Sequence, residues 1–164
     1  MMLMQLARRE PRTGGISLGA YKARVVVSYR DLTIDQEQRI RDSQWPPEAQ
    51  ESFRREFALM RQEGVREAES VVQAWRIGDV GFASLPGELF VEWGLKIKAE
   101  SPFPWTYPVE LGGDYLGYLV TEQAWEAGGY ESLLARSARP SVEGVARLVE
   151  AAQQLLVQLW EESA

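Results

Sequence analysis

Two segments of the chain combine glycine turns with side chains that can exchange protons or bind a metal. In the first, residues 80–85 (VGFASL) run into Pro86-Gly87, and Glu88 follows. We expect a strand over 80–85 and a helix over 89–99, which places Glu88 at a helix N-terminus, where unpaired backbone N–H groups stabilise an anion. Open α/β sheets also hold their sites at the carboxyl ends of strands. Two interpretations therefore stay open: Glu88 caps its helix, or it serves a site.

The second segment, residues 111–121 (LGGDYLGYLVT), carries two tyrosines three positions apart among glycines. A phenol in a cleft donates a proton, and a phenolate binds a hard cation. The alternative is that Tyr115 and Tyr118 pack as aromatic core residues with hydrogen-bonded hydroxyls. Further along, Glu131 either brings a second carboxylate near Glu88 or is a surface residue after a helix stop at Gly128-Gly129.

Periodicity predicts the elements that position these residues. Strands are expected over 21–29, 70–77, 80–85 and 105–111, with a hairpin turn at Gly78-Asp79. Helices are expected over 35–41, 48–62, 89–99 and 122–127, the last with Thr121 as its N-cap. The clearest helix is C-terminal, because apolar residues recur every three or four positions from Val145 to Leu159. The expected fold is an α/β layered domain: a mixed β-sheet flanked by helices, with a long C-terminal amphipathic helix.

The length of 164 residues suits one domain, so we expect an irregular N-terminal segment over 1–20 and a single α/β domain over 21–164. The net charge of −6 argues against nucleic-acid binding driven by phosphate contacts. The sequence contains neither cysteine nor histidine, which excludes Ser-His-Asp and Cys-His triads and histidine-ligated metals built from this chain alone. It shows no signal-peptide pattern and no transmembrane segment, so a cytoplasmic location is expected.

Four motifs in order make residues 77–160 resemble the C-terminal part of the catalytic domain of the neutral/alkaline non-lysosomal ceramidase family. They are LPGELFVE (85–92), SPF (101–103), YLGYLVT (115–121) and GYE (129–131). The sequence departs from the family pattern at Asp114, where an asparagine is common, and at Val142-Glu143-Gly144. The histidine-bearing N-terminal portion of the family has no counterpart here.

The resemblance implies a zinc amidohydrolase that cleaves the amide of N-acylsphingosine. In that family two histidines, a glutamate and a tyrosine hold the metal. The glutamate matches Glu88, the ligand tyrosine matches Tyr118, and Tyr115 is expected to be a neighbour. Because both histidines are missing, the implied site is incomplete, and a Glu-Tyr pair alone is a poor zinc site.

The sequence therefore predicts a partial or degenerate ceramidase-like enzyme that is inactive without a histidine-bearing partner segment. The alternative is a non-catalytic interaction or oligomerisation domain, which would self-associate through exposed apolar surface. A third possibility is an uncharacterised fragment of a longer hydrolase.

Overall fold

A four-stranded mixed sheet organises the part of the chain that the computed structural model describes, residues 14–32 and 36–162. Its strand order is β1-β2-β3-β5, with antiparallel pairing from β1 to β3 and a parallel pair between β3 and β5. The strands are β1 (Leu18–Ser28), β2 (Glu67–Ile77), β3 (Val80–Ser84) and β5 (Trp105–Val109). The predicted mixed sheet is therefore confirmed.

The predicted hairpin between β2 and β3 is also present. Gly78 adopts a φ of 59°, the left-handed region that glycine reaches without steric cost, and its N–H donates to the Ser17 carbonyl at 2.8 Å. That contact ties the turn to the start of β1. β1 begins at Leu18, so the strand takes in the last three residues of the segment expected to be irregular; residues 1–13 of that segment lie outside the described part.

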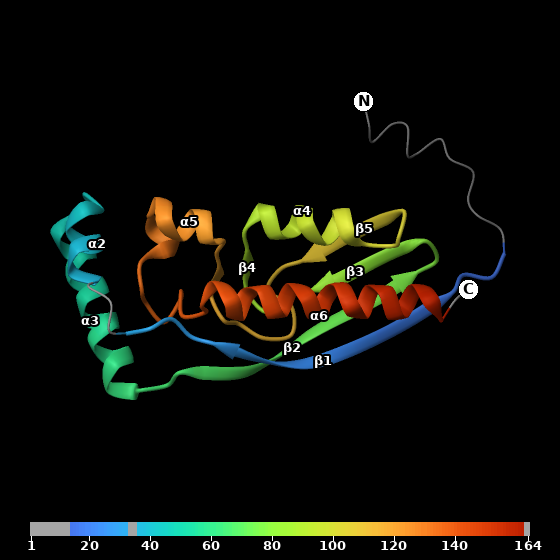
Figure 1. Cartoon of the computed structure of the whole chain (residues 1–164), viewed down its shortest axis with the longest axis horizontal. Coiled ribbons are helices and arrows are strands. Elements are labelled where there is room, and N and C mark those ends of the chain that lie inside the picture. Colours follow the sequence, from blue (N-terminus) through green and yellow to red (C-terminus); the bar gives the residue numbers. More distant parts are fainter. Residues whose placement is uncertain (1–13, 33–35, 163–164) are drawn as a thin grey trace, which may run out of the picture.

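Two helices cover one face of this sheet (Figure 1). α6 (Val142–Glu161) packs against β1, β2 and β3, and α4 (Val91–Glu100) packs against β5 and α6. The apolar stripe of α6 is buried as its periodicity predicts, including Leu148 and Leu156, which have no exposed surface. The long C-terminal amphipathic helix is therefore confirmed.

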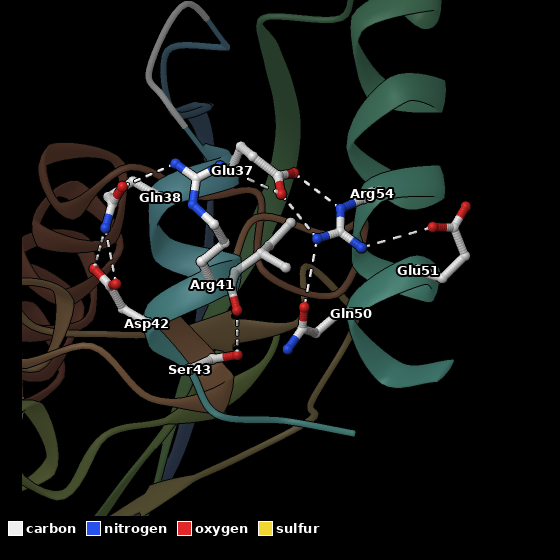
Figure 2. Close-up of polar contacts among 9 residues, drawn as sticks. Glu37, Gln38, Arg41, Asp42, Ser43, Gln50, Glu51 and Arg54 are labelled. Atoms are coloured by element: carbon white, nitrogen blue, oxygen red, sulfur yellow. Dashed lines mark hydrogen bonds and ion pairs between the residues drawn. The ribbon is translucent and has the colours of Figure 1, made fainter. Parts of the chain in front are cut away.

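The remaining helices lie beyond the end of the sheet (Figure 1). α2 (Gln36–Asp42) and α3 (Pro47–Glu63) are joined by Arg54, whose Nε and Nη2 donate to the Glu37 carboxylate at 2.9 and 2.8 Å (Figure 2). In α5 (Glu122–Ala127), the ring of Trp125 lies 3.9 Å from the guanidinium of Arg30 and 3.7 Å from that of Arg39. The Arg39 contact attaches α5 to α2, and the Arg30 contact attaches it to the segment that follows β1.

A second, two-stranded parallel sheet joins β4 (Glu88–Leu89) to β6 (Tyr118–Leu119). This ladder corrects the prediction of a helix over 89–99, since α4 begins only at Val91. Among the described residues, none of the helices combines the length and apolar character needed to cross a bilayer.

Candidate functional site

The β4–β6 ladder brings Glu88 and Tyr118 side by side. The two residues are register partners, and the Glu88 N–H donates to the Gly117 carbonyl at 2.9 Å. Neighbouring strands lie about 4.8 Å apart and paired residues point to the same side of a ladder, so the carboxylate and the phenol project together. On the other side, Leu89 and Leu119 enter the core.

Glu88 does not lie at a helix N-terminus, and the interpretation that it caps its helix is wrong. Phe90 is the N-cap of α4, and the acidic residue in the first turn is Glu92. The physical reason is long-range: backbone hydrogen bonds to residues 117 and 119 hold Glu88 and Phe90 in an extended conformation. Such bonds override a local preference for helix.

Two glycines permit close packing at this ladder. A Cβ atom at Gly87 would lie 2.3 Å from the Gly117 carbonyl oxygen. A Cβ atom at Gly117 would lie 2.0 Å from the Ser137 carbonyl oxygen. Gly117 also has a φ of 83°, which disfavours any other residue. Gly87 therefore permits the close approach of the strands that carry Glu88 and Tyr118, and Gly117 permits the close approach of Ser137 to the start of β6.

Tyr115 reaches the same carboxylate from the preceding loop. Its hydroxyl donates to Glu88 Oε1 at 3.2 Å, while its backbone N–H donates to Asp114 Oδ1 at 2.8 Å. Asp114 Oδ2 in turn accepts from the Ser70 hydroxyl at 2.8 Å, which anchors the loop to β2. Tyr115 is thus a neighbour of the pair, and Asp114 is the residue that positions it.

The structure adds Tyr130 to the residues around Glu88 and Tyr118. Tyr130 belongs to the short 3-10 helix η1 (Tyr130–Ser132). Its ring meets the Tyr118 ring edge-on, with centroids 5.9 Å apart. It also contacts the rings of Phe53 and Trp45 at 5.6 and 5.5 Å. In the sequence, the GYE motif at 129–131 points to Tyr130. No motif in the sequence points to Phe53 of α3, which packs against it.

Desolvation and nearby negative charge raise the pKa of both site tyrosines. Desolvation raises the pKa of Tyr118 above its ordinary value, and the negative charges of Glu88 and Glu131 raise it further. Desolvation also raises the pKa of Tyr115, as does its hydrogen bond to Glu88. Both phenols are therefore neutral proton donors at neutral pH. The charge of Glu131 also acts on the Tyr118 phenol.

An open hollow of about 640 Å³ is lined in part by Tyr115 and Tyr130. Its lining also includes Phe53 and Glu56 of α3, and Arg136. Arg136 Nε and Nη2 donate to the Glu56 carboxylate at 2.7 and 2.8 Å, and this hydrogen bonding lowers the pKa of Glu56. The hollow therefore has a mixed apolar and polar lining, and Tyr115 and Tyr130 connect it to Glu88 and Tyr118.

The donor set in this chain does not fit a zinc ion by itself. Catalytic zinc sites hold three protein ligands besides water or substrate. Across residues 14–32 and 36–162, no group of three or more His, Cys, Asp or Glu side chains is arranged to hold a metal. The carboxylate of Glu88 and the phenol of Tyr118 amount to two oxygen donors.

Comparisons with known proteins bear on the fold. No protein-family model matches the chain, and no curated protein matches it significantly. A solved structure described as ceramidase complexed with C2 aligns with a TM-score of 0.50 and 20% sequence identity, over 57% of this chain and 15% of its own. The structure of neutral ceramidase from Pseudomonas aeruginosa aligns with a TM-score of 0.48 and 22% identity, over 58% of this chain and 16% of its own.

This chain therefore spans only about 15% of the length of the ceramidase that it matches. At 20% identity the likeness establishes the fold and no residue role. Within that limit the predicted resemblance is confirmed, and the chain has the fold of part of a ceramidase.

Proposed function

We propose that this chain is the glutamate- and tyrosine-bearing part of a ceramidase-like amidohydrolase. The observation that carries the proposal is the register pairing of Glu88 with Tyr118, which sets a carboxylate and a phenol side by side on one face of a ladder. The likeness of part of the chain to the ceramidase fold supports the same proposal. The substrate class is an N-acylsphingosine-type lipid amide, taken from the resemblance.

The pair would supply two oxygen ligands of a zinc ion, and a histidine-bearing partner segment would supply the others. Because this sequence has no histidine, the chain is expected neither to hold zinc tightly nor to hydrolyse an amide by itself. Tyr115 is expected to orient the Glu88 carboxylate through its hydrogen bond. No catalytic step is assigned to the chain alone.

The first experiment tests the isolated chain. Its zinc content after dialysis against zinc, and its hydrolysis of a fluorescent N-acylsphingosine, are both expected to be at background. Stoichiometric zinc with turnover would show that no histidine-bearing partner is needed and would contradict the proposal.

The second experiment uses the complex purified from the source cells with an affinity tag on this chain. We expect zinc and amidase activity in the complex, and loss of zinc in Glu88→Gln and Tyr118→Phe. Glu48→Gln, an exposed carboxylate on α3, is the matched control and should keep both. If the complex stays active and zinc-loaded when both site variants are combined, the assignment of these two residues is wrong.

A further inference from the structure

The four-stranded sheet has a second face, opposite to α4 and α6. Residues alternate between the two faces of a strand, and hydrogen-bonded partners on neighbouring strands share a face. Gly81 and Arg76 lie on the helix side, since a Cβ at Gly81 would meet Phe103 and Leu156, and Arg76 Nη1 donates to the Leu159 carbonyl. Trp75 and Phe82 therefore lie on the other side.

Two apolar rows cross all four strands on this second face. The register assigns one row to Leu18, Ile77, Val80 and Trp105, and the next to Ala20, Trp75, Phe82 and Tyr107. We call these eight residues the apolar sheet face. In the second row, Trp75 stacks on Phe82 with ring centroids 5.4 Å apart, and Phe82 stacks on Tyr107 at 5.7 Å.

This face is exposed in the described structure. The exposed fractions are 73% for Leu18, 54% for Trp105 and 49% for Tyr107. A loop covers the next row, because Gly112 lies against Ser84 and Gly113 against Gln73. Most of the exposed apolar surface of this face therefore lies in the two rows, and Val26 of β1, 45% exposed, lies beyond them.

The composition of this face is unusual for an exposed one. Antiparallel pairs such as β1–β2 and β2–β3 commonly leave one face in water, but that face normally carries polar residues. A contiguous apolar patch at the surface of a protein commonly marks an interaction site. None of the eight residues is charged, whereas the chain as a whole carries a charge of −6. Two copies can thus join at this face without burying charge.

We propose that the apolar sheet face binds the same face of a second copy of this chain. A two-fold axis that runs parallel to the strands, between β2 and β3, sets β2 of one copy against β3 of the other and β1 against β5. The same axis places each row of one copy opposite the equivalent row of the other copy. Trp75 then meets the partner's Phe82, and the small Ala20 meets the large Tyr107 of the partner subunit.

The size of the apolar sheet face bears on the strength of such an interface. Two rows on four strands, at about 6.6 Å between rows and 4.8 Å between strands, cover roughly 250 Å² of sheet plane. The projecting aromatic side chains raise the accessible area above that plane, and because a standard interface buries roughly 800 Å² per partner, a dimer at the weak end of the range is expected. Lys22 and Arg24 of β1, with Glu67 and Glu69 of β2, lie outside the two rows and balance in sign. The proposal concerns a different surface from the Glu88–Tyr118 pair and does not depend on the proposed enzymatic function.

Sedimentation equilibrium of the purified chain over a wide concentration range tests the proposal. The wild type is expected to move from 18.6 kDa at the lowest concentrations to twice that mass. Trp105→Glu and Tyr107→Glu each bury a carboxylate in the interface and should weaken dimerisation by about tenfold or more. Both residues lie on β5, which has an exposed outer edge, and far-UV circular dichroism checks that the variants fold.

The matched control is Val91→Glu, at a residue of α4 that is 67% exposed on the other side of the sheet. It should dimerise like the wild type. Because the chain has no cysteine, Ile77→Cys adds a single thiol close to the proposed axis, and a short bis-maleimide should cross-link it, whereas Val91→Cys should remain monomeric.

A wild type that stays monomeric at the highest concentrations would overturn the proposal. So would a dimer that Trp105→Glu and Tyr107→Glu leave intact, or one that Val91→Glu disrupts equally. A monomer that becomes a heterodimer through this face with another protein would assign the face to that partner instead. The zinc content of the chain is not part of this test, so its failure is separate from failure of the amidohydrolase proposal.

Discussion

Backbone hydrogen bonds between β4 and β6, with the close approach that Gly87 permits, place the Glu88 carboxylate beside the Tyr118 phenol. The carboxylate disfavours ionisation of the phenol, because two negative charges would then lie side by side. Any role of Tyr118 as an anionic ligand therefore needs a positive charge beside it, and none of the described residues acts on the phenol in that sense.

Glu88→Gln is expected to lower the pKa of Tyr118 towards its ordinary value of about 10, without reaching it. Burial and the charges of the other neighbours still raise that pKa. A tyrosine Cζ chemical-shift titration by NMR measures it. Tyr115→Phe, which removes a weaker neighbour, should produce a smaller change. An unchanged value in Glu88→Gln would mean that the carboxylate does not act on the phenol.

Gly117→Ala is expected to destabilise the fold by about 2–5 kcal/mol. The new Cβ would meet the Ser137 oxygen, and a left-handed backbone costs roughly 1–2 kcal/mol in a non-glycine residue. Gly128→Ala is the matched control, because Gly128 has a φ of 80° but nothing within 4 Å of its Cβ position. Unfolding in urea measures both variants, and equal losses would show that the close approach at Gly117 carries no cost.

Capping and ion pairing set the ends and the packing of the helices. The side chain of Ser141 accepts the Gly144 N–H at 3.0 Å and shares a hydrogen bond with the Ser28 hydroxyl at 2.8 Å. It therefore both starts α6 and ties that start to the end of β1.

Ser141→Ala is expected to cost about 1 kcal/mol of stability, the usual value of an N-cap side chain. Ser141→Thr keeps an oxygen in place and should restore most of the loss. Thermal unfolding followed by circular dichroism measures both. If the two variants lose the same stability, the cap hydrogen bond is not the source of the effect.

The Glu37–Arg54 pair should make the α2–α3 packing pH-dependent. Hydrogen bonding from Arg54 lowers the pKa of Glu37. A carboxyl whose pKa is lower in the folded state stabilises above the unfolded pKa of about 4.3, and this contribution is lost as the pH falls through the folded value. The difference in Tm between the wild type and Glu37→Gln should therefore shrink between pH 7 and pH 3.

The matched control for this pH series is Glu126→Gln, at an exposed carboxylate on α5. Its difference in Tm from the wild type should stay small across the series. A Glu37→Gln difference that is constant with pH would show that the ion pair does not stabilise the folded chain.

The core of the whole molecule is the interface between α6 and the sheet. Leu156 is fully buried there, whereas the next residue, Val157, is 39% exposed. Leu156→Ala should cost about 2–5 kcal/mol, since it removes buried methyl groups and leaves a cavity. Val157→Ala should change stability by no more than about 0.5 kcal/mol. Urea unfolding compares them, and similar losses would contradict the assigned face of α6.

Local patterns were enough to predict much of this architecture. The spacing of Val145, Leu148 and Leu156 predicts α6 and its buried face, and Gly78-Asp79 predicts the β2–β3 hairpin. Both signals act between residues close in the chain, where backbone preference and periodicity decide the structure. The same reasoning identified Thr121, whose side chain accepts the Ala124 N–H at 3.2 Å as the cap of α5.

Contacts between residues distant in the sequence decided the pairing at the site and the exposed face of the sheet. Composition alone showed that the chain has no histidine and no cysteine, and its motifs singled out Glu88 and Tyr118. Only the tertiary structure paired those two residues, because hydrogen bonds from segments about thirty residues apart turned an expected helix start into a strand. It alone also left Trp105 and Tyr107 exposed, since which face of a sheet the helices cover depends on how the layers pack and not on alternation within any one strand.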